Sequence, residues 1–344
     1  MELYFLDESF AVIDGPIDDA LYAEWDERFF EVGTFVIRLP RDTFSRACRA
    51  VYVEAVSESG VRYGGRVEYL SSGEDGECEM RGRLLESLIS DIVLHGGGLY
   101  TGTLSDVLRE VLEENLTHTP AQLDEDFCRI EDEVTLAPAW QNLAEWLHST
   151  LRPYGASFSV KLRGGVPTLR IEVGRDLTTD GGGGYSRAVF STSFGNIGGV
   201  EYERDARDMR NCAYICGSDG YVATVDCSGG GARREIYKNA ADIVRSRFES
   251  EDEYVAALVR RGMEVLARCT EDVHVSAECD GGAGLEYGVD YALGDVCDVA
   301  DAQLALSFAL RVTGAVTVYE NGSATIHPTF GDEIGLIKKL RSAE

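Results

Sequence analysis

The sequence has little positive charge, and lysine is especially rare. Thirty-two lysine and arginine residues stand against 60 aspartate and glutamate residues, so the formal net charge of the 344-residue chain is −28. The lysines are Lys161, Lys238, Lys338 and Lys339, and every other basic residue is an arginine. Proteins that bind nucleic acid neutralise phosphates with many cations. The composition therefore argues against specific nucleic-acid binding. The acidity serves either solubility alone or the repulsion of DNA that passes close by.

Long hydrophobic runs are also missing. No stretch approaches the roughly 18 to 20 apolar residues that a helix needs to cross a bilayer, and the first ten residues, MELYFLDESF, contain three acids and no basic residue. We therefore expect no membrane segment and no secretory signal, and we expect folding in a cytoplasm. The length exceeds the size at which a single core stops growing, which favours two or three domains.

Motifs for catalysis or metal binding are absent from the sequence. The five histidines lie far apart, and the nine cysteines are scattered, with Cys212 and Cys216 as the closest pair. That pair has three residues between its members and no neighbouring histidine, so a zinc site is not expected. We expect the cysteines to be reduced thiols. No phosphate loop, nucleophile elbow or dinucleotide fingerprint is present. The sequence thus predicts no catalytic residue, no cofactor and no metal.

The first 100 residues are predicted to be mostly β. Phe35, Ile37 and Leu39 alternate with polar or outward positions in a strand that ends at Pro40, and residues 50–69 have the pattern of a β-meander. An aromatic group, Trp25, Phe29 and Phe30, lies just before this strand. It is interpreted either as core packing or as a candidate subunit interface.

The middle of the chain predicts helices and a hairpin. Residues 105–116 have an apolar stripe and a cap at Ser105, and a strongly acidic loop follows at 124–133. Residues 138–154 predict an amphipathic helix in which Trp140 begins the apolar repeat. This helix is expected to pack on a hairpin over residues 158–173.

The stretch SRAVFSTSFGNIGGVE, residues 186–201, joins a short strand to a glycine-rich turn. We expect Phe190 and Phe194, together with Trp140, to anchor the core of a small α+β domain. Further along, Ser250 and Glu253 form a capping box for a helix, and Asn321-Gly322 is a hairpin signal.

These patterns predict an α+β, β-rich, multidomain chain. The expected units are an N-terminal β-rich module at 1–100, a helix and acidic linker at 101–135, the small α+β domain at 136–205, strands and a helix at 206–268, a C-terminal β-rich module at 269–331 and a tail at 332–344.

Several blocks of the sequence resemble one phage protein family. They are FFEVGTFVIRLP at 29–40, RGRLLESLI at 81–89, AWQNLAEWLHSTLRPYG at 139–155, VGRDLT at 173–178, VFSTSFGNI at 189–197, EYERD at 201–205, ARREIY at 232–237, YALGDVCDV at 291–299 and IHPTFG at 326–331. In this order they resemble the siphophage tail-tip, or baseplate, hub proteins, which are related in fold to the baseplate hub protein of T-even phages.

The resemblance implies a homotrimeric ring at the virion tail tip, assembled in the host cytoplasm. The two β-rich modules become β-barrel-like tube modules, and the smaller α+β domain is inserted between them. The implied partners are the distal tail protein and tail tube, the tape-measure protein, and receptor-binding or spike proteins. In this setting, acidic side chains that line the DNA exit channel would not hold the phosphates of the passing DNA.

A second function class is a tail-associated cell-wall hydrolase. Such an activity resides in an added C-terminal domain in tail-tip proteins, and only DEIGLIKKLRSAE follows Gly331. We therefore expect the structural role rather than an enzyme, and a zymogram on purified cell walls separates the two.

Overall fold

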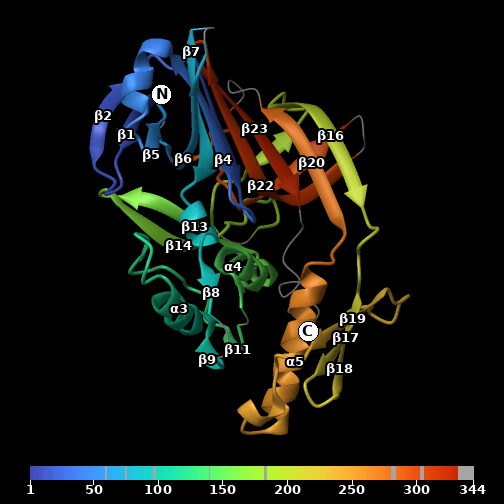
Figure 1. Ribbon diagram of the computed structural model, residues 1–344. Coiled ribbons are helices and arrows are strands. Elements are labelled where there is room, and N and C mark those ends of the chain that lie inside the picture. The colour runs from blue at the N-terminus through green and yellow to red at the C-terminus, as the bar shows by residue number, and fades with distance from the viewer. Residues whose placement is uncertain are drawn as a thin grey trace.

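The computed structural model describes residues 1–58, 60–73, 76–95, 98–138, 140–181, 184–279, 284–302 and 306–331. The chain is β-rich with five α-helices in these ranges, so the predicted α+β class is confirmed. Its strands form one large sheet of 13 strands and four small ones (Figure 1). Within the described residues no sheet closes on itself.

Seven strands from the first 84 residues form one part of the large sheet, in the order β3-β4-β7-β6-β5-β1-β2. Phe35, Ile37 and Leu39 on β4 are buried, and the residues between them are not, as the alternation predicts. The predicted meander is confirmed where β5 pairs with β6. The bounds are β1 (Glu2–Leu6), β2 (Val12–Ile17), β3 (Tyr22–Arg28), β4 (Thr34–Pro40), α1 (Phe44–Ala47), β5 (Tyr52–Val56), β6 (Arg62–Ser72) and β7 (Glu77–Leu84).

Six later strands complete the large sheet. They are β15 (Val189–Ser191), β16 (Ile197–Asp205), β20 (Asp272–Cys279), β21 (Val296–Asp301), β22 (Leu306–Glu320) and β23 (Ser323–Gly331). The first part of β22 pairs with β21, and its last part pairs with β3, so one strand joins the two ends of the chain. Asn321 and Gly322 form the turn between β22 and β23 with φ of 54° and 79°, which confirms the predicted hairpin.

A small α+β unit lies against the large sheet, and its residues share one core. The predicted hairpin is β13 (Ala156–Arg163) with β14 (Val166–Val173). Residues 101–135, the expected helix and acidic linker, contribute Leu108 and Phe127 to this same core. The other elements are α2 (Ser87–Ser90), β8 (Val93–Leu94), β9 (Tyr100–Thr103), α3 (Leu104–Asn115), β10 (Gln122–Leu123), β11 (Glu133–Leu136), β12 (Gln141–Asn142), α4 (Leu143–Leu151) and a 3-10 turn η2 (Arg152–Tyr154).

Two of the expected helices begin elsewhere than predicted. The side chain of Thr103, not that of Ser105, accepts a hydrogen bond from the N–H of Asp106 and caps α3. Asn142 caps α4, so this helix starts at Leu143 rather than near residue 138. In both cases an earlier or later cap residue satisfies the free N–H groups of the first turn.

A further unit is inserted between β16 and β20, which pair from Ile197 with Cys279 to Asp205 with Asp272. It contains β17 (Cys212–Gly217), β18 (Val222–Asp226), β19 (Glu235–Ala240) and α5 (Glu251–Ala267). The capping box of Ser250 and Glu253 is present. In Figure 1 this unit extends from the ends of β16 (yellow) and β20 (orange), and α5 lies beside the small α+β unit. No helix of the described residues is both long and apolar enough to cross a membrane.

Candidate functional site

Three parts of the chain meet at Arg311, a residue of β22 that is 2% exposed. Its Nη1 donates a hydrogen bond to the carbonyl oxygen of Gly294, and its Cζ lies 5.5 Å from the centre of the Phe29 ring. The same guanidinium contacts the small α+β unit, because a Cβ added to Gly155 would stand 2.5 Å from Nη2. One buried cation therefore touches β3's end, the hairpin unit and the loop before β21.

We call the region where these three parts meet the junction. Polar side chains hold it together at a second point. The Tyr287 hydroxyl donates to Oε2 of Glu27 at 2.8 Å, across 260 positions of sequence. The hydroxyl groups of Tyr63 and Thr317 lie 3.2 Å apart nearby. Burial raises the pKa of the Glu27 carboxyl, while the charge of Lys161 and the Tyr287 hydrogen bond oppose that shift. Such bonds hold the two ends of the chain in one relative position.

A bidentate ion pair secures the loop that leads from the hairpin to the later strands. The guanidinium of Arg175 donates to Asp295, with Nη2 at 2.6 Å from Oδ2, and the backbone N–H of Arg175 donates to Oδ1 at 2.7 Å. The Asp295 side chain is 4% exposed. Of these junction residues, only Phe29 was a candidate in the sequence. The signal that was available for Arg311 is its position as a lone charge in the apolar run FALRV.

The aromatic group proposed as a subunit interface lies largely inside the chain. Trp25 is fully buried between Phe35 and Tyr63, with ring centres 5.2 and 5.3 Å away. Phe29 is 3% exposed and forms an edge contact with Phe30, which is only half-buried. For Trp25 and Phe29 the structure matches the core-packing interpretation, because their surfaces are already covered. Phe30 stays a candidate for a subunit contact.

Two of the three predicted core anchors are exposed instead. Phe190 is fully buried, but its neighbours belong to the late strands rather than to the small α+β unit. Phe194 is 69% exposed because it lies in the turn after β15, where strand alternation has ended. Trp140 is also 69% exposed, because it precedes α4 and does not share that helix's apolar face. It packs against the His95 ring at a centre distance of 4.9 Å.

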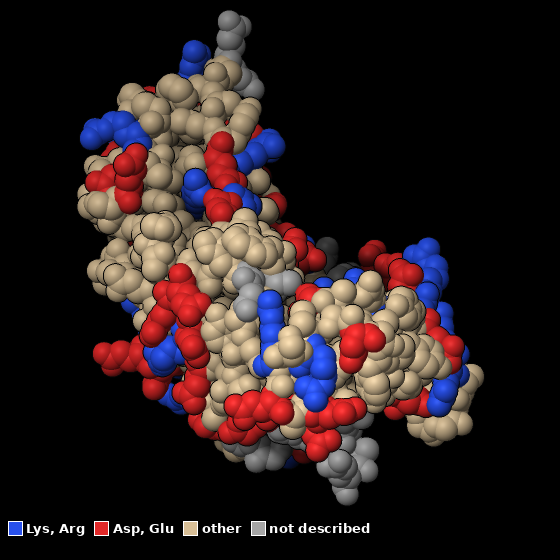
Figure 2. Space-filling model, turned by 60° about the horizontal axis from the view of Figure 1, so that its bottom comes forward, with Lys and Arg blue, Asp and Glu red and all other residues tan. Residues whose placement is uncertain are grey.

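The surface charge is distributed over separate groups. Figure 2 shows acidic side chains on the lower face in several patches, with basic side chains between them. The described residues contain no group of three or more histidine, cysteine or acidic side chains that could hold a metal ion. The eight cysteines whose side chains are described are free thiols.

The profile of the Siphovirus ReqiPepy6 Gp37-like protein family matches residues 1–332. No curated protein sequence matches significantly.

Solved structures of phage tail proteins share the fold. A tail protein from Neisseria meningitidis MC58 superposes with a TM-score of 0.62 at 12% identity, covering 98% of each chain. Prophage tail protein gp18 from Listeria monocytogenes EGD-e gives a TM-score of 0.58 at 11% identity, over 99% of this chain and 98% of that one. The 43 kDa tail protein of prophage MuSo2 from Shewanella oneidensis gives 0.55 at 11% identity, over 96% and 98%. The resemblance found in the sequence is confirmed, and the chain belongs to the Siphovirus ReqiPepy6 Gp37-like protein family.

Proposed function

We propose that the chain is the structural hub of a tailed-phage or prophage tail tip. It joins the tail tube and distal tail protein to receptor-binding or spike proteins, and it surrounds the channel through which DNA leaves. The observation that carries this proposal is the match to a siphovirus family over residues 1–332, together with a fold shared with phage tail proteins over almost the whole chain.

Symmetry gives the proposal a physical basis. The strands of the first 84 residues and those after residue 189 lie side by side in one sheet, joined where β22 pairs with β3. We propose that these two parts act as the tube modules of the hub. Three copies in a closed ring then present six similar modules, which suits a hexameric tail tube. The junction around Arg311 and Glu27 would keep the two modules at a fixed spacing in every copy.

The purified chain should therefore form a ring of three copies. Native mass spectrometry is expected to give three times the 37.6 kDa of the single chain, alone or after co-expression with the distal tail protein. A closed ring needs two different complementary surfaces on each copy. A monomer that persists at high concentration and also in the presence of the tail partner would contradict the proposal.

The excess of acidic side chains should be found on the wall of the DNA channel in the assembled ring. We expect carboxylates to outnumber basic groups on the wall of the DNA channel, since an acidic wall does not bind the phosphates of the passing DNA. Electron cryomicroscopy of the assembled tail tip measures this distribution directly. A neutral or basic channel wall, with the excess of acidic side chains on the outer surface, would contradict this part of the proposal.

A further inference from the structure

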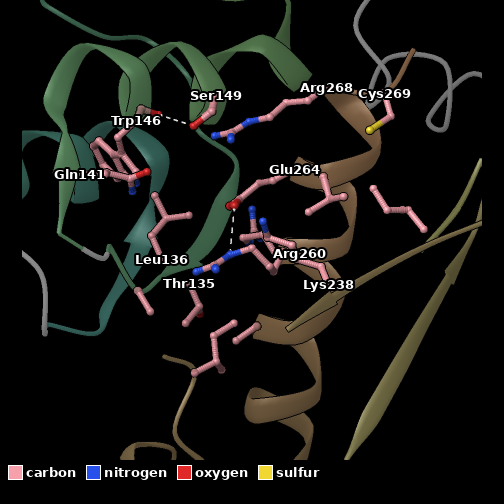
Figure 3. A pocket seen from close by; sticks show the side chains of 16 residues that line it. Thr135, Leu136, Gln141, Trp146, Ser149, Lys238, Arg260, Glu264, Arg268 and Cys269 are labelled. Atoms are coloured by element: carbon pink, nitrogen blue, oxygen red, sulfur yellow. Dashed lines mark hydrogen bonds and ion pairs between the residues drawn. The ribbon is translucent and has the colours of Figure 1, made fainter. Parts of the chain in front are cut away.

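A pocket of about 360 Å³ lies where the inserted unit meets the small α+β unit. Thr135 and Leu136 of β11 and Trp146 and Ser149 of α4 form one wall, and α5 with β19 forms the other. In Figure 3, the Arg268 side chain extends from the end of α5 toward Ser149, and Glu264 lies between Arg268 and Arg260. The size falls in the usual range for small-molecule sites.

Basic side chains gather around this pocket in a chain that is otherwise strongly acidic. Arg260, Arg261, Arg268 and Lys238 all line it. Two carboxylates oppose them: Glu264, whose Oε2 lies 3.5 Å from Nε of Arg261, and Asp242, whose Oδ2 lies 2.7 Å from Nη2 of the same arginine. Four cations against two carboxylates leave two positive charges in excess.

Three of the four basic side chains, those of Arg260, Arg268 and Lys238, form no ion pair with a carboxylate of the described residues. Arg260 donates to neutral acceptors, the Tyr154 hydroxyl at 3.2 Å and the Glu133 carbonyl oxygen at 3.1 Å. Within the described part of the chain, the side chains of Arg268 and Lys238 make no hydrogen bond or ion pair, and both residues are exposed. Arg261 already has both carboxylates as partners. The guanidinium of Arg268 is therefore available to a ligand in the pocket.

The chemistry of the lining selects the class of ligand. Guanidinium groups bind phosphate and carboxylate with paired N–H donors. Two uncompensated positive charges match a dianion, and a phosphate monoester carries close to two negative charges at neutral pH. Trp146, Leu136 and Ile243 add apolar surface beside the cations, which suits an organic group attached to the phosphate.

We propose that the pocket between α4 and α5 binds a small phosphate-bearing ligand, with Arg268 as its principal contact and Glu264 as a competing charge. Glu264 occupies the centre of the cationic group, so an incoming anion must displace its interaction with Arg261 or tolerate its charge. The inference concerns a binding site and is independent of the assembly proposed above.

Isothermal titration calorimetry with inorganic phosphate at constant ionic strength tests the site. The unmodified chain should bind one phosphate. Arg268→Ala should weaken binding about tenfold or more, since a hydrogen bond to a charged group contributes about 1.5 to 3 kcal/mol. Glu264→Gln should tighten binding, because it removes a negative charge and keeps the shape of the side chain. A second titration with glucose 1-phosphate asks whether the apolar wall contributes: tighter binding than that of inorganic phosphate assigns an organic phosphate, and equal binding assigns the free ion.

Arg49→Ala is the matched control, because the Arg49 side chain is also exposed, makes no hydrogen bond to the described residues and lies between α1 and β5, outside the pocket. It should leave phosphate binding unchanged. Opposite shifts for Arg268→Ala and Glu264→Gln cannot arise from general damage to the fold. The proposal is overturned if the chain binds no phosphate, including the case in which it binds only a glutamate-rich peptide. It is also overturned if Arg49→Ala and Arg268→Ala weaken phosphate binding equally, or if Glu264→Gln leaves phosphate binding unchanged or weaker.

Discussion

Replacing Phe190 with alanine is expected to lower the free energy of unfolding by about 3 to 5 kcal/mol. The ring is fully buried, with the ring of Tyr291 at 4.8 Å and that of Phe330 at 4.9 Å between centres. Both neighbours come from segments at least 100 positions later in the chain, so the substitution opens a cavity between β15 and distant strands. Urea-induced unfolding followed by circular dichroism measures the loss.

Phe194→Ala provides the control for this prediction. The two phenylalanines are four residues apart, yet Phe194 is 69% exposed and lies in a turn. Its removal should change the free energy of unfolding by no more than about 0.5 kcal/mol. Equal effects of the two substitutions on the isolated chain would show that Phe190 is not the core residue described above.

Local signals in the sequence located many of the elements. The alternation in residues 34–40 gave the correct buried face of β4, because every second side chain of a strand points to the same side. Asn321 and Gly322 tolerate positive φ, and so their hairpin could be placed. Ser250 and Glu253 satisfy backbone N–H groups within four residues of each other, which makes the capping box visible without tertiary information.

Predictions were wrong where a periodic pattern extended past the end of its element. Trp140 fits the three-to-four-residue repeat of Leu143 and Leu147, but the helix begins only after Asn142. The amide oxygen of Asn142 accepts a hydrogen bond from the N–H of Glu145, and this cap was the signal that could have excluded Trp140 from the buried face. The prediction that Phe194 anchors a core was wrong for a similar reason, because the strand that buries Phe190 ends at Ser191.

The junction could not be predicted from one sequence, because its contacts are not local. Glu27 and Tyr287, or Phe29 and Arg311, become neighbours only once β22 has paired with β3. Glu27 has no local feature that marks it as buried among the 92 charged side chains of the chain, and the apolar run around Arg311 does not identify the partners of that arginine. The cationic pocket is likewise assembled from β11, α4, β19 and α5, whose order along the chain does not reveal their proximity.

Gly174→Ala should destabilise the chain by about 3 kcal/mol or more, through a clash that side chains cannot relieve. A Cβ at this position would lie 1.6 Å from the carbonyl oxygen of Gly294 and 2.9 Å from Nη1 of Arg311. Gly174 directly follows β14, and the loop after it is held by Arg175 and Asp295. Accommodating the methyl group would require the hairpin unit to move away from the late strands, which would also separate Arg311 from its partners.

Gly198→Ala tests whether the close approach itself is responsible. Gly198 lies in β16, and a Cβ there would meet no atom within 4 Å. Alanine is also a better strand residue than glycine, since it loses less backbone entropy on folding. Urea unfolding should therefore give Gly198→Ala a stability equal to or slightly above that of the unmodified chain, while Gly174→Ala unfolds at much lower urea or fails to accumulate in soluble form. A Gly174→Ala protein as stable as Gly198→Ala would mean that the contact between residues 174 and 294 is not close in solution, and that the junction does not fix the small unit against the late strands.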